Sequence, residues 1–161
     1  MGLFDFLKKK DDKISNPKNV CKEIKSEQKN YAYKQGFSVA GASDYQDNFK
    51  KVLKRNKNYD KATRRIQEDV YEYDLFETYD NVELIEEPTN PYDPNAIQVV
   101  YKGVLLGYIK RGSTSRVRNI IKNDYIIKIT FFGGNVKGWL DDQYLEEKKK
   151  LNCRITIFYN K

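Results

Sequence analysis

The stretch LIEEPTNPYDPNAIQVVYKGVLLGYIKRG, residues 84–112, carries three local signals within one short segment. AIQVVY and VLLGYIK are rich in β-branched and aromatic residues and flank Lys102 and Gly103, which is typical of two strands around a tight turn. PTNPYDPN holds three of the four prolines, which fix φ, and Asn and Asp side chains that accept bonds from their own backbone. The segment predicts a well-ordered loop followed by a β-hairpin.

A helix and further strands are predicted downstream of this segment. Ser113 or Ser115 can cap the helix. The apolar residues that recur at helical spacing are Val117, Ile120 and Ile121. We expect strands over residues 125–132 and 153–159, with GGNVKG between them as a turn.

Upstream, the sequence predicts a strand and a helix. QGFSVAGAS, residues 35–43, has a strand-like pattern, and Asp44 can cap a helix over residues 45–56. Residues 58–69 are polar and fit either a second short helix or a loop.

A second hairpin is expected between these elements and the quoted segment. VYEYDLFETY, residues 70–79, and VELI, residues 82–85, are separated by Asp80 and Asn81, as in a hairpin. About six short strands with two helices predict a mainly β (α+β) fold built as a small curled or barrel-like sheet.

The chain is long enough for one domain. Its 161 residues include 30 Lys and Arg against 23 Asp and Glu. Residues 1–30 have only a short apolar patch and a possible helix from Pro17 to about Gln28, so we expect a charged tail there and the domain over residues 31–161.

Charge is segregated along the sequence. Residues 70–100 hold eight acids and no Lys or Arg, whereas residues 101–139 hold eight bases and only Asp124 as an acid. A basic face that meets phosphates is one consequence. The alternative is that the two segments lie side by side and neutralise each other.

Composition excludes several classes of site. The chain has no histidine and only Cys21 and Cys153, so zinc fingers, disulfide frameworks and histidine-based catalytic triads are excluded, and we expect neither metal nor cofactor. No apolar run approaches the roughly 18 residues of a membrane span, and Asp5 interrupts a signal-like start. A cytoplasmic protein is expected.

The segment 84–112, with FSVAG at residues 37–41 before it, resembles the signature of the HIRAN domain family over about residues 36–125. The resemblance implies a modified OB-like β-barrel with two helices. It also implies binding of single-stranded DNA and capture of its 3′-hydroxyl end.

The resemblance assigns the binding residues mainly to the loop. Tyr92 would stack a base, a contact worth about 1–3 kcal/mol, and Asp93 would accept a bond from the terminal hydroxyl and repel a phosphate. Tyr108, Lys110 and Arg111 occupy positions where the family contacts the terminal nucleotides. Each has a structural alternative: Tyr92 could cover the barrel mouth, Asp93 could cap the loop and Tyr108 could belong to the core.

Other candidate contacts lie outside the loop. DNA-binding family members have an Arg and an aromatic residue after the first glycine, where this chain has Ala42, Ser43 and Asp44, so the following Tyr45 is the candidate ring. The basic residues predicted on the second helix, which would meet phosphates, are Arg116, Arg118 and Lys122.

Two other functions compete with DNA binding. A nuclease would need an Asp followed by E-x-K, and the first such match after Asp93 is the distant Glu146 to Lys148, so we expect no enzyme activity. A protein-interaction adaptor that docks on a DNA-processing enzyme through residues 70–87 or the amphipathic start is the remaining alternative.

Overall fold

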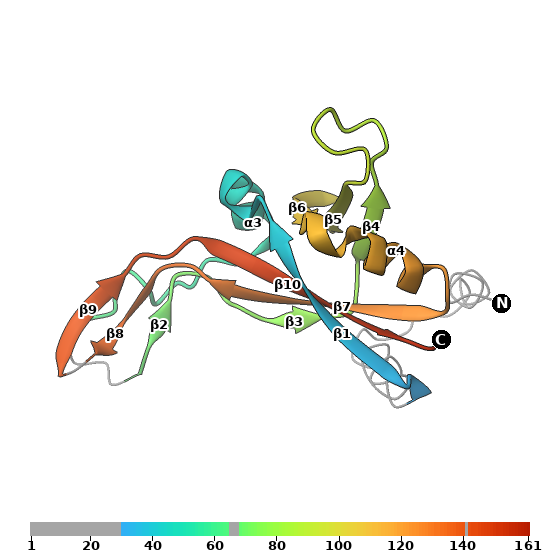
Figure 1. Ribbon diagram of the computed structural model, residues 1–161. Coiled ribbons are helices and arrows are strands. Elements are labelled where there is room, and N and C mark those ends of the chain that lie inside the picture. Colours follow the sequence, from blue (N-terminus) through green and yellow to red (C-terminus); the bar gives the residue numbers. More distant parts are fainter. Residues whose placement is uncertain (1–29, 65–67, 141) are drawn as a thin grey trace, which may run out of the picture.

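Strands dominate the computed structural model, which describes residues 30–64, 68–140 and 142–161 (Figure 1). The strands are β1 (Tyr33–Ala40), β2 (Val70–Tyr71), β3 (Glu77–Thr78), β4 (Val82–Glu86), β5 (Ile97–Tyr101), β6 (Val104–Ile109), β7 (Tyr125–Gly133), β8 (Val136–Leu140), β9 (Gln143–Glu147) and β10 (Leu151–Tyr159). The helices are η2 (Ala42–Asp44), α3 (Gln46–Val52), η3 (Arg111–Ser113) and α4 (Thr114–Ile121).

Seven strands form one curled antiparallel sheet in the order β3-β7-β10-β1-β6-β5-β4. The two outer strands, β3 and β4, follow each other in the sequence and are joined by residues 79–81, so the sheet turns back toward itself. The prediction of a small, mainly β, OB-like barrel with two α-helices is confirmed.

The core lies between this sheet and helices α3 and α4, which cover the same face (Figure 1). The side chains with least exposure come from both α-helices and from four strands: Phe49, Val117, Ile97, Val99, Leu106, Ile129, Cys153, Ile155 and Ile157. Asn48 of α3 donates to the Leu105 carbonyl, and Gln46 exchanges bonds with the backbone of Leu151. These contacts fix the helix across β6 and β10.

Gly107 of β6, directly before Tyr108, is required by the close approach of β1 and β6. Its φ is +152°, and a Cβ there would meet the Ala40 carbonyl oxygen at 2.6 Å and Val39 Cγ1 at 2.7 Å. Only glycine fits this position without movement of the backbone.

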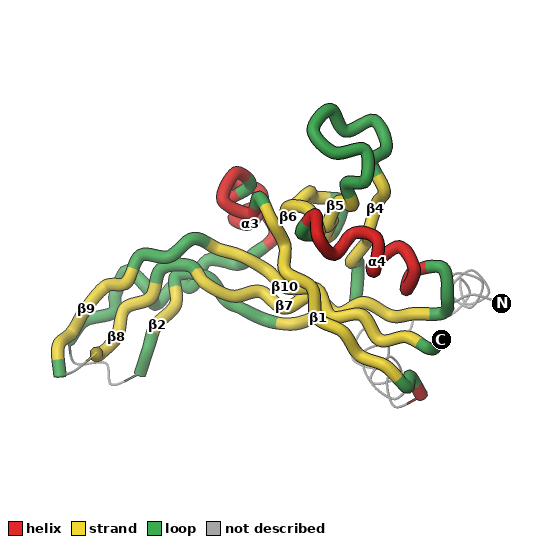
Figure 2. The backbone as a smooth tube through the Cα atoms, in the orientation of Figure 1, coloured by secondary structure: helices red, strands yellow, loops and turns green. Residues whose placement is uncertain are grey.

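The remaining strands form a second sheet, β2-β8-β9, that projects from the barrel (Figure 2). GGNVKG was predicted as a turn, but only Gly133 and Gly134 turn the chain, because Val136 already begins β8 and Gly138 lies within it. The hairpin β8–β9 therefore lies between the two long strands that the sequence predicts, and the described residues form ten strands rather than about six.

The predicted hairpin of residues 70–79 and 82–85 is wrong. Residues 70–71 pair with β8, residues 77–78 pair with β7, and β4 pairs with β5. The chain bends between β2 and β3, since each strand finds a partner far away in the sequence.

Other elements agree with the sequence prediction. The first strand, the first helix, the hairpin β5–β6, helix α4 and the strands β7 and β10 lie within a few residues of their expected positions. Residues 58–64, which fitted a helix or a loop, form turns. The expected tail and its possible helix fall on residues 1–29, outside the described residues. No helix in the described part of the chain is long and apolar enough to cross a membrane.

Candidate nucleic-acid interface

The loop between β4 and β5 is held in one shape by its own polar groups. It rises above the sheet in Figure 2, and the Glu87 amide donates to the Ala96 carbonyl at its base (2.9 Å). At its tip, Asn90 Oδ1 accepts bonds from the amides of Tyr92 (3.0 Å) and Asp93 (3.1 Å). Prolines and Asx-type bonds together restrict the loop backbone.

Tyr92 presents its side chain to solvent at the tip of this loop. It is 87% exposed, more than any other large hydrophobic residue among those described. Exposure of an aromatic ring to water normally destabilises the folded protein relative to burial of that ring. The structure therefore excludes the alternative that Tyr92 covers the barrel mouth.

Asp93 joins the loop to the start of η3. Its Oδ1 accepts the Asn95 amide (2.9 Å), and its Oδ2 lies 3.1 Å from Nε of Arg111. The pKa of Asp93 is lowered, first by the Asn95 amide bond and then by Arg111. Arg111 also donates to the Tyr92 carbonyl (3.0 Å) and remains 74% exposed, so it has surface left for an anion.

A second cluster lies at the base of the loop, around Tyr108 on β6. Tyr108 Oη donates to Glu87 Oε2 (2.9 Å), and its ring centroid is 6.3 Å from that of Tyr45. Burial, followed by the Glu87 bond, raises the pKa of Tyr108 to about 12. The pKa of Glu87 is lowered, chiefly by the Asn90 side-chain amide. Tyr45 and Tyr108 thus form a half-buried floor beneath the loop.

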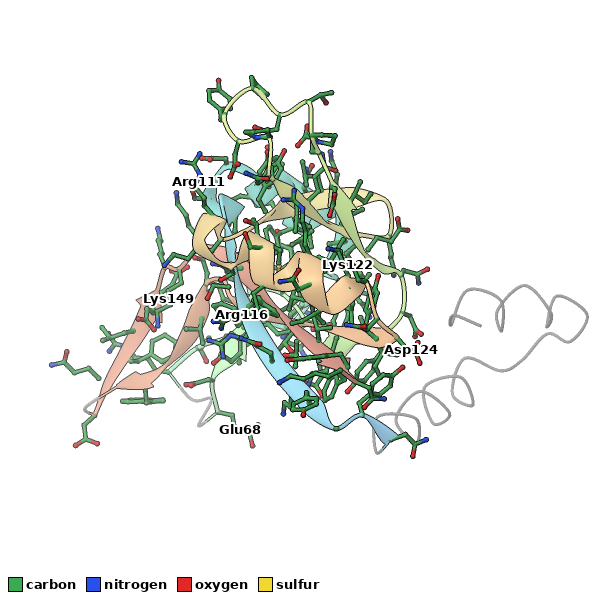
Figure 3. All side chains as sticks on the ribbon, turned by 45° about the vertical axis from the view of Figure 1, so that its right-hand side comes forward. Glu68, Arg111, Arg116, Lys122, Asp124 and Lys149 are labelled. Atoms are coloured by element: carbon green, nitrogen blue, oxygen red, sulfur yellow. The ribbon has the colours of Figure 1, made fainter. Side chains whose placement is uncertain are left out.

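Arg116 and Arg118 of α4 and Lys122, which follows its last residue, do not act alike. Arg118 faces the loop, where its Nε lies 2.9 Å from Glu86 Oε1 and its Nη1 lies 2.8 Å from Asn95 Oδ1. Arg116 and Lys122 are exposed and form no ion pair with any residue that the structure describes. Figure 3 shows Arg111 toward the loop, Arg116 beside β1 and Lys122 near the end of α4.

Comparison with known protein families gives a match that covers the loop described above. The model of the HIRAN domain family matches residues 57–136, which include the loop, Tyr108, Lys110, Arg111 and α4. This chain contains a HIRAN domain. HIRAN domains are DNA-binding modules, so the chain belongs among nucleic-acid-binding proteins. No curated protein and no solved structure matches the chain.

The HIRAN match begins downstream of β1, at residue 57, whereas the resemblance to FSVAG placed its start near residue 36. Tyr45 therefore lies outside the matched residues, although its ring contacts Tyr108 within them. Tyr45 is therefore placed next to the matched residues by tertiary packing on Tyr108 and not by the sequence motif.

The acidic and basic segments of the HIRAN domain partly neutralise each other. The ion pairs that join residues 70–100 to residues 101–139 are Arg111 with Asp93, Arg118 with Glu86 and Lys128 with Glu77. Lys110, at the entrance to η3, is exposed and has no such pair in the described chain. Three of the eight acids of residues 70–100 thus pair with bases of residues 101–139, and Lys110 is among the bases whose charge remains for a ligand.

The prediction that Asn and Asp side chains of this loop accept bonds from their own backbone is confirmed at Asn90 and Asp93. Sequence reasoning missed Glu87, whose carboxylate accepts bonds from the Asn90 side-chain amide and the Tyr108 hydroxyl. Glu87 carried no usable signal, since its partner Tyr108 lies on another strand.

The residues of the considered nuclease motif lie apart. Glu146 belongs to β9 in the second sheet, where its carboxylate accepts a bond from Tyr59 Oη (2.7 Å), and Asp93 belongs to the loop. Within the described ranges, no group of three or more His, Cys, Asp or Glu residues is arranged to hold a metal.

Proposed function

We propose that this HIRAN domain binds single-stranded DNA and holds its 3′-hydroxyl end at the loop between β4 and β5. The observation that carries the proposal is the exposed ring of Tyr92 on a loop whose backbone is already fixed by Asn90 and Asp93. Because the backbone is already fixed, stacking of this ring on a base costs less conformational freedom than on a mobile loop.

Asp93 supplies the selectivity for a free end. Its carboxylate offers about four acceptor positions, and the Asn95 amide and Arg111 use two of them. A further position can accept the 3′-hydroxyl proton, whereas a phosphate there would meet a like charge. Arg111, bonded to the same carboxylate, can contact the next phosphate along the strand.

The remaining candidate residues have separate roles in this proposal. Tyr45 and Tyr108 support the second base, and Lys110 contacts phosphate oxygens. Arg116 and Lys122 contribute charge on the outer faces of α4. Arg118 acts mainly by holding the loop, because Glu86 and Asn95 already occupy its guanidinium. Such a module would serve DNA repair, replication or phage DNA metabolism in the cytoplasm.

End recognition can be tested by fluorescence anisotropy with labelled strands that end in a 3′-hydroxyl or a 3′-phosphate. Wild type should prefer the hydroxyl end. Tyr92→Ala should weaken both strands by about 1–3 kcal/mol, the worth of one stacked base. Asp93→Asn should lose the preference more than the affinity. Tyr71→Ala, which removes an exposed ring from the second sheet, is the matched control and should bind as wild type does. Equal binding of both ends by wild type would contradict end recognition.

An adaptor function is the second candidate. The second sheet exposes Tyr71, Trp139 and Leu145, each by more than two-fifths of its surface. By strand register Tyr71 and Leu145 lie on one face of this sheet and Trp139 lies on the other. The face with Tyr71 and Leu145 supports an interaction surface for a protein such as a DNA-processing enzyme. Wild type that binds no single strand at low salt would favour this candidate.

A further inference from the structure

A pocket of about 400 Å³ lies between α4 and the ends of β1 and β10, away from the loop. The residues that line it are Gln35, Arg116, Asn119, Ile120, Asn123, Tyr159 and Lys161. Its volume is in the range of pockets that hold small organic ligands.

One face of α4 and the end of two strands produce this pocket. The helix contributes side chains at intervals of three, four and seven residues, from Arg116 to Asn123, which places them on one face. On β1, Phe37 and Val39 point into the core, and Gln35 continues the same side of the strand. On this side of β1, the side chains that face α4 are therefore apolar at Val39 and Phe37 and polar at Gln35.

The pocket has two cations without a paired acid. Arg116 and Lys161 form no ion pair with the described residues, in contrast to Arg118 on the loop side of the same helix. Lys161 Nζ lies 4.8 Å from the ring centroid of Tyr33, so it is held next to an aromatic surface. Two unpaired cations around one cavity favour an anionic ligand.

The pocket also offers an aromatic ring and amide groups. Tyr159 stacks on Tyr33 with ring centroids 5.5 Å apart and planes 25° from parallel. Asn123 Nδ2 donates to the Asn119 carbonyl (3.2 Å), which fixes that amide and leaves its oxygen available as an acceptor. A ligand that fits these groups has an anionic part, a flat ring and hydrogen-bonding edges.

We propose that this pocket is a second nucleotide-binding site, in which Arg116 and Lys161 bind the phosphate and Tyr159 contacts the base. The ligand is a nucleoside monophosphate, either free or as one unit of a strand. The site does not depend on end recognition at Tyr92, because α4 presents Arg118 to the loop and Arg116 to the pocket.

The test uses the full ¹⁵N-labelled chain and follows the side-chain amides of Gln35, Asn119 and Asn123 by NMR. The probes are thymidine 5′-monophosphate, a 20-residue oligothymidylate, thymidine and inorganic phosphate. The monophosphate and the oligonucleotide should shift all three amides, and thymidine and phosphate alone should require higher concentrations. Saturation by the oligonucleotide at a lower nucleotide concentration than the monophosphate assigns the site to a strand, and the reverse order assigns it to free nucleotide. Absence of a shift with both nucleotide probes would overturn the proposal.

Variants separate this pocket from the loop and from general charge effects. Arg116→Gln should weaken the monophosphate about tenfold, the usual effect of one charge-assisted hydrogen bond. Lys161→Gln should act in the same direction, and it serves as the readout if Arg116→Gln does not fold. Lys102→Gln removes an exposed cation that lies outside the pocket and outside the loop, so its affinity for the monophosphate should match wild type. Tyr92→Ala should leave the amide shifts caused by the monophosphate unchanged. Equal weakening by Arg116→Gln and Lys102→Gln would overturn the assignment, because it would show an unspecific effect of charge.

Discussion

The two sides of α4 use arginine in opposite ways. Arg118 faces the loop and is bonded to Glu86 and Asn95, whereas Arg116, two residues earlier, faces the pocket and pairs with no acid in the described chain. Side chains two positions apart in an α-helix point about 200° apart around the helix axis, so Arg116 and Arg118 reach different surroundings.

This difference separates charge that shapes the protein from charge that remains for a ligand. On the loop side, the acidic segment supplies Glu86 and Asp93, and their pairs with Arg118 and Arg111 fix the loop before any DNA arrives. On the pocket side, the cations keep their full attraction for phosphate. A count of Lys and Arg in α4 would overestimate its contribution to DNA binding.

The largest expected effect comes from Gly107→Ala, which would destabilise the whole domain and so disrupt the loop side and the pocket side of α4 together. The new Cβ would press on the Ala40 carbonyl, so β1 and β6 would have to separate. We expect a loss of about 3 kcal/mol or more in the free energy of unfolding, measured by urea denaturation. Gly112→Ala is the control, because a Cβ there meets nothing within 4 Å, and it should change stability by less than about 0.5 kcal/mol. Equal effects of the two changes would show that the β1–β6 approach is not as tight as described.

A smaller effect should distinguish the two arginines. Arg118→Gln should cost about 1 kcal/mol of stability, since it breaks a partly exposed pair with Glu86 and the bond to Asn95. Arg116→Gln should leave the unfolding midpoint within experimental error. The comparison fails if thermal denaturation gives the two variants the same midpoint.

The loop side should also respond to acid. Because the pKa of Asp93 is lower in the folded chain than in the unfolded one, its stabilising contribution is present above the unfolded pKa and is lost as the pH falls through the folded value. The difference in melting temperature between wild type and Asp93→Asn should be constant from pH 7 to about 5 and should shrink toward pH 3. Glu87→Gln should follow the same profile, as the pKa of Glu87 is also lowered. A constant difference down to pH 3 would contradict this account.

The smallest effect concerns the salt dependence of single-strand binding. Arg116→Gln and Lys122→Gln should each make the slope of log K against log salt shallower by up to about 0.7, the value for one phosphate contact. Arg118→Gln should change the slope less, because its charge is already paired with Glu86. A larger change for Arg118 than for Arg116 would reverse the proposed division of roles.

Local patterns predicted the elements whose partners are close in the sequence. The hairpin around Lys102 and Gly103 and the helix with Val117 and Ile120 follow directly from period and turn residues. The region from Val70 to Thr78 did not, because β2 and β3 pair with β8 and β7, and no local period encodes partners so far away.

The same limit applies to the site. Tyr92 and Asp93 could be proposed as binding residues because the loop motif is continuous in the sequence. Two sets of contacts could not be predicted, because each partner comes from a different element. They are the bonds of Arg118 to Glu86 and Asn95, and the bond of Tyr108 to Glu87. Periodicity placed the arginines on a helix but said nothing about what each one faces.

The pairing of β1 with β10 has a consequence for how the chain is made. Near the start of this ladder, the Ala32 amide bonds to Asn160, 128 positions away. During synthesis, β1 has its neighbour β6 early, but the side that belongs to β10 stays unpaired until the ribosome has released residues 151–159. The loop and α4 can form before then, yet the seven-stranded sheet can be completed only after translation of that strand. An exposed strand edge on a nascent chain can pair with strands of other chains, so the interval before β10 is made favours aggregation.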